Sequence, residues 1–253
     1  MVTFSANLGF LWDGLPLPIG IQMASKNGFS AVECHWPYET PANETKRALD
    51  KADLTMLSLN TRRGDDGEMG LAAIPGRTVE ARLAIDEAIR YGAQVGAQAV
   101  HVMAGNAPPV PASFLNYLAN LRYACRQAAT FDMSILIEPL NLIDNPGYYL
   151  RSFNDALGVI EAVDCENMKL LFDVYHVEMI GRDPLTVLDE VFPVLGHVQF
   201  ASVPGRNEPH LGSVDYQPIF DRLDELGWTQ PLGAEYRPAG DIIDGLVWMQ
   251  QYR

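Results

Sequence analysis

The sequence predicts an α/β fold, a single (β/α)8 TIM barrel, on two observations. Short β-rich runs alternate with longer amphipathic stretches about eight times along the 253 residues. Helix-ending glycines recur at three places between a helical run and the next strand, as expected for repeated βα units. Polar residues also follow the apolar runs, most clearly in Leu170–His176, where Asp173 and then His176 follow the run, and they mark a candidate site. An open doubly wound sheet is the alternative, but it usually needs fewer strands.

The predicted elements follow in order along the chain. The strands are Thr3–Asn7, Ala31–Cys34, Thr55–Leu59, Ala99–Met103, Ser134–Ile137, Leu170–Asp173, His197–Phe200 and Leu232–Ala234. The helices lie near residues 16–27, 43–52, 78–95, 113–131, 152–163, 184–194, 217–226 and 241–252. Ser152 and Asp241 stand at helix starts as caps. Gly28, Gly96 and Gly227 follow helical runs, as helix-ending glycines in the left-handed conformation do.

The chain shows no linker, low-complexity tract or charge block, so residues 1–253 are expected to form one domain. No run approaches the length of a membrane span, and the N-terminus lacks a basic region followed by an apolar core and a cleavage site. We therefore expect no membrane partner and a cytoplasmic location. The segment Asn7–Trp12 holds a single glycine and does not form a phosphate-binding loop, which argues against a nucleotide ligand.

Charge and cysteine usage narrow the class of protein further. Lysine and arginine number 18 against 32 acidic residues, a formal net charge of −14, with no basic stripe, so nucleic acid is a poor partner. Cys34, Cys125 and Cys165 lack the CxxC spacing of a thiolate zinc site and are expected to be reduced and structural. A small-molecule substrate is expected, and association into homo-oligomers stays open.

Four polar residues close the fifth to eighth predicted strands: Glu138, Asp173, Gln199 and Glu235. The C-terminal ends of all strands in a parallel barrel open onto one face, where active sites lie. Crowded carboxylates raise one another's pKa unless a cation holds them, and an oxygen-rich set suits Mg²⁺ or Mn²⁺ better than zinc or copper. Each acid alone is more simply explained as solvated or paired with an arginine; four in succession favour a shared metal site.

Further polar residues fall near the ends of the first four strands and could line the same face: Asn7, Glu33 with His35, Asn60, and His101 with Met103. A lone histidine such as His101 is more simply explained as a core residue bonded to a carbonyl. His176 is better placed to donate a hydrogen bond to a substrate oxygen. Arg206 lies in a polar loop and suits a small carboxylate, although an ion pair with Glu208 explains it equally well.

Two longer features have a functional and a plain explanation each. The glycine-rich segment Gly64–Arg77 is either a lid that excludes water or a variable surface loop. The aromatic residues after the first two strands form either an apolar pocket wall or ordinary packing: Phe10, Trp12, Trp36 and Tyr38.

Several segments together carry a family resemblance: GLAAIPGR (Gly70–Arg77), HVMAG (His101–Gly105), ILIEPLN (Ile135–Asn141), FDVYH (Phe172–His176), GHVQFASVPGRNEP (Gly196–Pro209) and GAEYRP (Gly233–Pro238). With them the chain resembles the hydroxypyruvate isomerase and 2-oxo-tetronate isomerase family of the xylose isomerase-like barrel superfamily. The likeness runs over nearly the whole length, with the motifs in the family's order and spacing.

The resemblance implies a βα barrel with one divalent metal ion, Mg²⁺ or Mn²⁺, and no organic cofactor. The implied metal ligands are Glu138, Asp173, Gln199 and Glu235, of which the two glutamates would also be the acid/base pair. The third ligand in the wider superfamily is commonly histidine, so Gln199 sets this branch apart. His176 matches a substrate-contacting histidine of related sugar epimerases. Arg206 lies close to an arginine with a similar role there, although the loop spacing differs, and His101 is a third candidate substrate contact.

The resemblance further implies a cofactor-free aldose–ketose type isomerisation, from hydroxypyruvate to tartronate semialdehyde through a cis-enediolate. A 2-oxo-tetronate or a free ketose is the alternative substrate. ILIEPLN and PGRNEP are more similar to hydroxypyruvate isomerase, whereas VHVMAG is more similar to the tetronate enzyme. An abasic-site nuclease ranks far lower, because it needs a basic groove and usually a histidine-rich trinuclear zinc site, and the chain has five histidines. A non-catalytic sugar-binding barrel gives no reason for two metal-held glutamates.

Overall fold

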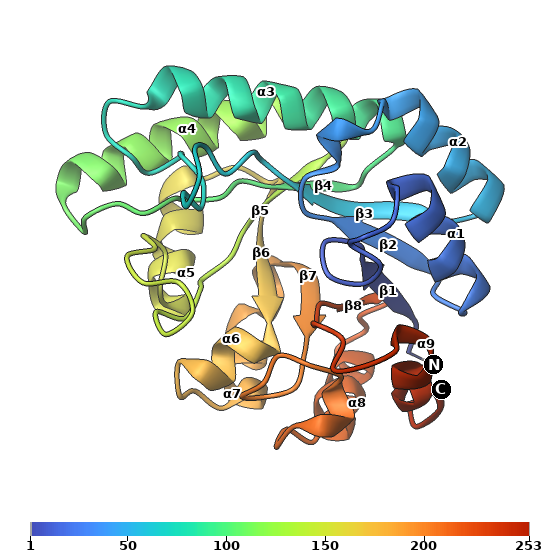
Figure 1. Cartoon of the computed structure of the whole chain (residues 1–253). Coiled ribbons are helices and arrows are strands. Elements are labelled where there is room, and N and C mark those ends of the chain that lie inside the picture. The colour runs from blue at the N-terminus through green and yellow to red at the C-terminus, as the bar shows by residue number, and fades with distance from the viewer. Residues whose placement is uncertain (1, 253) are drawn as a thin grey trace.

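The structure is a computed structural model that describes residues 2–252. Within these residues the strands form a closed parallel barrel in the order β1 to β8, and β1 pairs with β8 to close it (Figure 1). The strands are β1 (Phe4–Asn7), β2 (Ala31–Cys34), β3 (Thr55–Asn60), β4 (Ala99–His101), β5 (Ser134–Ile137), β6 (Met168–Asp173), β7 (Leu195–Phe200) and β8 (Leu232–Ala234). The predicted (β/α)8 TIM barrel is confirmed.

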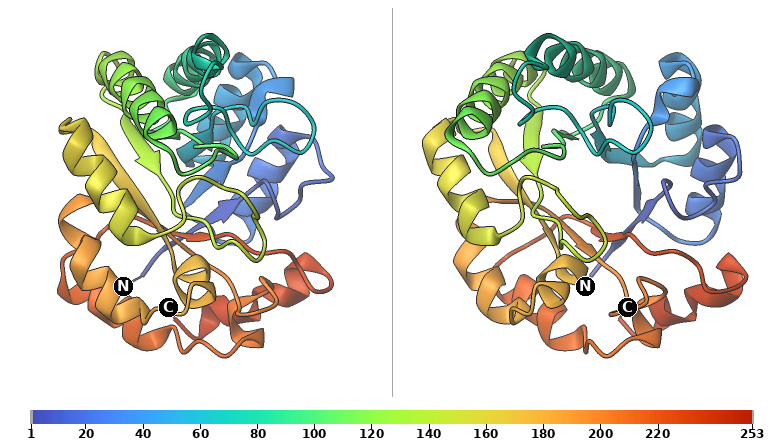
Figure 2. Two further views of the ribbon diagram at one scale, coloured as in Figure 1. Left: turned by 90° about the vertical axis from the view of Figure 1, so that its left-hand side faces the viewer. Right: turned by 60° about the vertical axis from the view of Figure 1, so that its left-hand side comes forward.

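The helices lie around the outside of the barrel (Figure 2). They are α1 (Leu17–Lys26), α2 (Ala42–Ala52), α3 (Thr78–Val95), α4 (Pro111–Ala129), α5 (Phe153–Val163), α6 (Val174–Met179), α7 (Pro184–Val191), α8 (Gln217–Glu225) and α9 (Ile242–Gly245). Short 3-10 turns are η1 (Pro37–Glu39), η2 (Phe192–Val194), η3 (Pro209–Leu211) and η4 (Leu246–Gln250). Each helix among residues 2–252 is too short or too polar to span a lipid bilayer.

The local signals predicted most helix ends correctly. Ser152 accepts a hydrogen bond from the Asp155 backbone and caps α5, and Gly28, Gly96 and Gly227 have φ of 84°, 76° and 83°. The predicted boundaries of α3 are the same as in the structure, and those of most other helices differ by about one to three residues. Two larger differences stand out. The continuous helix predicted over 241–252 is wrong, because α9 gives way to η4. The tighter turn accompanies the burial of Trp248, whose indole nitrogen donates to the Tyr236 hydroxyl at 3.1 Å.

The second difference is α6, a helix that the periodicity of the sequence did not predict. It begins directly after β6, because Asp173 has extended backbone and its side chain accepts a hydrogen bond from the Tyr175 backbone at 2.9 Å. A polar strand end thus serves also as a helix cap. Because α6 follows β6 directly, the helix fixes the position of His176 close to the end of the strand. A loop at this point would not determine where this side chain lies.

Successive side chains of a strand point alternately into and out of the barrel, and the inward-pointing ones form an apolar layer and, closer to the C-terminal ends of the strands, a polar layer. Ala99, Leu136 and Leu171 form a small buried cluster of their own, separate from the large core between barrel and helices. Two residues further along each strand the side chain points inward again. The inward residues at the C-terminal rim are all polar: Asn7, Glu33, Asn60, His101, Glu138, Asp173, Gln199 and Glu235. The polar rim is therefore built by strand geometry.

The seam where the barrel closes is sealed by aromatic packing. Phe4 on β1 lies 4.8 Å from Trp248 and 5.7 Å from Phe200 between ring centroids, and Phe200 lies 5.4 Å from Phe220 on α8. Rings of this size bury the largest apolar areas in a core, so this cluster fixes β1 against β7 and β8. It thereby holds Asn7 and Glu235 at one edge of the rim.

Candidate active site

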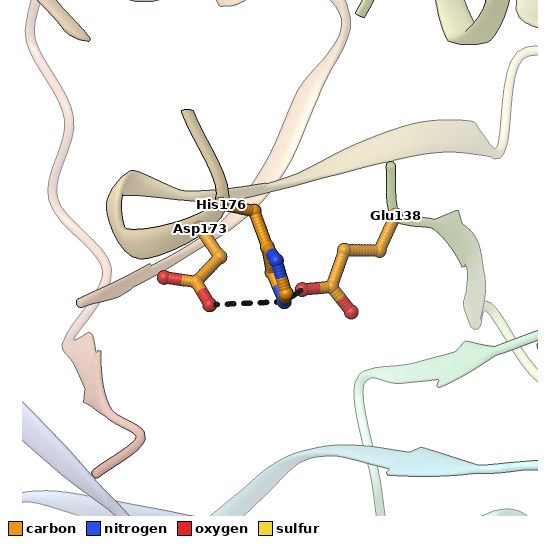
Figure 3. A group of neighbouring side chains, drawn as sticks. All are labelled: Glu138, Asp173 and His176. Carbon is orange, nitrogen blue, oxygen red and sulfur yellow. Dashed lines mark ion pairs between the residues drawn. The ribbon is translucent and has the colours of Figure 1, made fainter. Parts of the chain in front are cut away.

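Glu138, Asp173 and His176 converge at the rim from β5, β6 and α6 (Figure 3). The His176 ring lies between the two carboxylates, with Nε2 at 3.7 Å from Glu138 Oε1 and 3.7 Å from Asp173 Oδ2. All three side chains are buried. These residue types, so close together, could hold a metal ion.

The protonation of His176 decides its role in this group. Its Nδ1 accepts hydrogen bonds from the Asn141 backbone N–H at 3.1 Å and from the Asn141 side-chain amide at 2.8 Å. Burial lowers the pKa of His176 to about 3, with the charge of Arg206 acting in the same direction, so the ring is neutral and Nε2 carries its proton. A protonated nitrogen cannot ligate a metal. His176 therefore presents its N–H between the two carboxylates, 3.7 Å from each and beyond hydrogen-bond distance, with no partner among residues 2–252.

Arg206 bridges two of the predicted metal ligands. Its Nη2 donates to Glu235 Oε2 at 2.6 Å and to Asp173 Oδ2 at 3.3 Å. The alternative ion pair with Glu208 does not form, because both Glu208 oxygens accept from the Ala239 backbone N–H at 3.3 and 3.1 Å. Arg206 therefore points into the site, and its buried Nε has no partner within residues 2–252.

Glu235 is held by further donors on its other oxygen. Asn7 Nδ2 donates to Glu235 Oε1 at 2.9 Å, and His35 Nε2 lies 2.8 Å from the same atom. Gly9 leaves the room that His35 needs, since a Cβ at position 9 would lie 2.1 Å from His35 Nδ1. Residues from the first and second βα units thus orient the last glutamate.

The buried acids titrate in opposite directions. Burial raises the pKa of Glu138 well above its usual range, and the charges of Glu235 and Asp173 add to this. Burial raises the pKa of Asp173 to about 7, although Arg206 opposes it. Burial would also raise the pKa of Glu235, but Arg206 and His35 outweigh it and lower that pKa to about 2. The surroundings of Glu138 and Glu235 therefore displace the pKa values of these two glutamates in opposite directions.

His101 joins the group from β4. Its Nδ1 lies 3.8 Å from Glu138 Oε2, beyond hydrogen-bond distance, and burial lowers its pKa to about 4. The alternative of a core histidine bonded to a carbonyl is not what forms, because its side chain makes no such bond within the described chain and Nε2 has no partner there. His101 thus presents a neutral ring to the site.

The side-chain oxygen atoms at the rim are suitable ligands for a divalent cation. Glu138 Oε1 and Gln199 Oε1 are buried oxygens with no hydrogen-bond partner among residues 2–252, and a buried acceptor is costly without one. The Gln199 amide is anchored at its other end by Glu33. Asp173 and Glu235 hold a cationic group between them, the Arg206 guanidinium. Carboxylate and amide oxygens are ligands that hard ions prefer.

A cavity of about 560 Å³ opens above this group. Phe10 and Trp36 line it, as one explanation of the aromatic residues predicts, whereas Trp12 packs on Phe29 and Tyr38 on Tyr91. The segment Gly64–Arg77 reaches the cavity through Met69 and pairs with β4's loop at a bridge between Gly70 and Ala104. Arg63, Arg206 and Arg237 also line it, so cations gather here in a chain of net charge −14.

Sequence reasoning missed the support for His176. Asp144 accepts from both the Asn141 side chain at 3.0 Å and the Tyr175 hydroxyl at 2.6 Å, and thus ties the loop after β5 to α6. The signal that could have found Asn141 is its position, three residues after Glu138 in the same motif. The cysteines are as expected for structural residues: burial raises the pKa of Cys34 and Cys125 to about 12, so both thiols stay protonated.

Comparisons with known proteins agree with this architecture. The family model described as xylose isomerase-like TIM barrel matches residues 21–252. A 2-oxo-tetronate isomerase of Haemophilus influenzae is 38% identical, and the hydroxypyruvate isomerase of Escherichia coli 33%, each over 100% of both chains. The crystal structure of an AP endonuclease, family 2, from Brucella melitensis superposes with a TM-score of 0.96 at 33% identity, over 100% of both chains. The chain belongs to the xylose isomerase-like TIM barrel family and, within it, to the hydroxypyruvate and 2-oxo-tetronate isomerases, and it is an isomerase.

Proposed function

We propose that the protein isomerises a small 2-oxo acid, hydroxypyruvate to tartronate semialdehyde, with Glu138 and Glu235 as the acid/base pair. One observation carries the proposal. Two buried glutamates in one cavity have pKa values displaced in opposite directions, Glu138 upward and Glu235 downward. A pair of carboxyl groups in one site whose surroundings move their pKa values apart is characteristic of acid/base catalysis.

The proton transfers follow from this difference. Glu138 is the more basic carboxylate and in its ionised form takes the proton from C3 of the substrate. The electron pair of that bond forms the C2–C3 double bond, and the C2 carbonyl pair moves onto oxygen. Glu138 then returns the proton to C2. Glu235 moves the hydroxyl proton from the C3 oxygen to the C2 oxygen, so that C3 becomes the aldehyde and no redox partner is needed.

The remaining residues bind and orient the substrate. The Nε2–H of His176 is aimed between the carboxylates and donates to the oxygen on which charge develops. The Nε–H of Arg206, which has no partner in the described chain, suits the substrate carboxylate. His101 faces the same cavity as a neutral ring and is the third proposed contact.

The same site would hold a divalent metal ion, Mg²⁺ or Mn²⁺. The proposed ligands are Glu138, Asp173, Gln199 and Glu235, which supply the oxygen-rich set that such ions prefer. When bound, the ion would polarise the C2 carbonyl and favour the ionised form of Glu138. The ligand set leaves out His176, because the proton on Nε2 points toward the carboxylates.

The test is product analysis of the purified protein. NMR after incubation of hydroxypyruvate with added Mn²⁺ or Mg²⁺ should detect tartronate semialdehyde, and a chelator should abolish turnover. Glu138→Gln and Glu235→Gln should each lower kcat by at least about 100-fold. Glu190→Gln, which removes a surface partner of Arg182, is the matched control and should stay at wild-type rate. Substantial activity in either site variant contradicts the acid/base pair.

A four-carbon 2-oxo-tetronate is the second candidate substrate. The cavity of about 560 Å³ has room for it, and a relative named for that activity is 38% identical, as is a relative named putative hydroxypyruvate isomerase. The same NMR assay with both acids separates the candidates by kcat/KM. Nucleic acid is not proposed as a substrate, because a net charge of −14 disfavours a phosphate backbone. Cytoplasmic location and homo-oligomerisation stay predictions.

A further inference from the structure

Glu33 lies at the polar rim from β2, buried and across the barrel from β7. Its Oε2 accepts hydrogen bonds from His197 Nε2 at 2.6 Å and Gln199 Nε2 at 2.9 Å, with Ser58 Oγ at 3.4 Å. A buried carboxylate is costly unless it is well bonded. The proton-transfer scheme gives Glu33 no part, so its presence here calls for another role.

The hydrogen bond to Gln199 fixes which way the amide faces. A carboxylate only accepts hydrogen bonds, so the NH₂ group of Gln199 must face Glu33. Its Oε1 then points away from Glu33, buried and without a partner in the described part of the chain. In the opposite orientation the amide would set two oxygens against each other and present N–H groups to the cation site. Only the observed orientation offers a ligand atom.

Gly233 on β8 provides the space for this contact. A Cβ there would lie 2.3 Å from Glu33 Oε1, 2.8 Å from Gln199 Cγ and 3.0 Å from His197 Nε2. Strands β8 and β1 separate β2 from β7 in the barrel, so the side chains must meet over Gly233. The absence of a side chain at this strand position is therefore what lets Glu33 reach Gln199.

We propose that Glu33 is a positioning residue that holds the Gln199 amide with its oxygen toward the metal ion. The inference rests on the proposed metal site and deepens it. It explains how an amide, which has two nearly isosteric ends, can replace a histidine ligand: a carboxylate behind it makes the two ends unequal. Partners of this kind that orient a metal ligand typically contribute 10- to 100-fold in affinity, about the effect expected here.

The experiment measures Mn²⁺ affinity by calorimetry rather than turnover. Glu33→Gln keeps the shape but lets position 33 donate, so the Gln199 amide loses its preferred orientation and Kd should rise about 10- to 100-fold. The exchange Glu33→Gln/Gln199→Glu restores a donor at position 33 and an acceptor at position 199, and its Kd should return to within about fivefold of wild type. Glu190→Gln, the surface control, should bind as wild type does.

The outcomes separate the two proposals. Wild-type affinity in Glu33→Gln, or no recovery in the exchanged pair, overturns the role of Glu33 while leaving the metal site intact. A wild-type protein that binds no Mn²⁺ overturns the metal site and this inference together. If Glu33→Gln fails to fold, the comparison of the exchanged pair with Gln199→Glu still decides. Both variants carry a carboxylate at position 199 and differ only at position 33, so equal Kd in the two overturns the role of Glu33. Unchanged metal-free melting temperatures exclude a purely structural effect.

Discussion

Arg206 Nη2 lies 2.6 Å from Glu235 Oε2, and the same nitrogen reaches Asp173 Oδ2 at 3.3 Å. One guanidinium thus ties the loop after β7 to the ends of β6 and β8. It also stacks 4.8 Å above the Tyr175 ring and 5.3 Å from the Phe10 ring centroid. A cation in this position offsets the charge of two buried carboxylates and holds the aromatic side chains that line the cavity in place.

Arg206→Gln should therefore lower both stability and activity. Loss of the cation leaves two buried carboxylates unpaired, which costs about 3 kcal/mol in the metal-free protein, and kcat/KM should fall about 100-fold. The control is Arg237→Gln, because Arg237 stacks on the same Phe10 ring at 5.2 Å but pairs with no carboxylate among residues 2–252. Urea denaturation and steady-state kinetics measure the two effects. Equal losses in both variants would show that stacking on Phe10, rather than the carboxylate contacts, matters.

Gly9→Ala should lower activity with little effect on the fold. The added Cβ would meet His35 Nδ1 at 2.1 Å, which displaces the ring from Glu235 Oε1 and removes one of the donors that orient this glutamate. A displacement of about 1 Å is expected to cost about 100-fold in kcat. Gly14→Ala, in the same loop, meets nothing within 4 Å and should keep wild-type kcat. Equal kcat in the two variants would contradict the role of His35.

The part of the site that the sequence predicted is the part that strand geometry determines. Glu138, Asp173 and Glu235 were found from their positions at strand ends, because alternation and a closed barrel leave one face for them. The contacts of Arg206 and Asn141 could not be predicted, since they depend on loop paths. Helix α6 was missed because six residues are too few for a periodic pattern to stand out.

The contribution of Asp173 to the stability of the metal-free protein should fall as pH rises toward 7. The pKa of Asp173 is raised to about 7 from a usual value near 4, so the folded state binds more protons than the unfolded state between these values. Its contribution is full below about pH 4 and is lost as pH rises through about 7. Asp173→Asn removes this dependence on pH. The difference in unfolding free energy between wild type and variant should therefore change with pH by a few kcal/mol in total, on the order of 1.4 kcal/mol for each unit by which the pKa is raised. A constant difference from pH 5 to 8 would rule out a raised pKa.

Metal binding should release protons and therefore tighten with pH. Burial raises the pKa of both Glu138 and Asp173 in the metal-free protein, so each holds a proton more readily than a solvated carboxylate does, whereas ligand carboxylates must be ionised. The Kd for Mn²⁺ should fall about tenfold per pH unit for each proton released, between about pH 5.5 and 7.5. Calorimetry in buffers of different ionisation enthalpy counts these protons. Glu138→Gln removes one group that titrates, so the number of protons released on Mn²⁺ binding should decrease by about one, even if some affinity remains. An unchanged number would mean that Glu138 does not lose a proton when the ion binds.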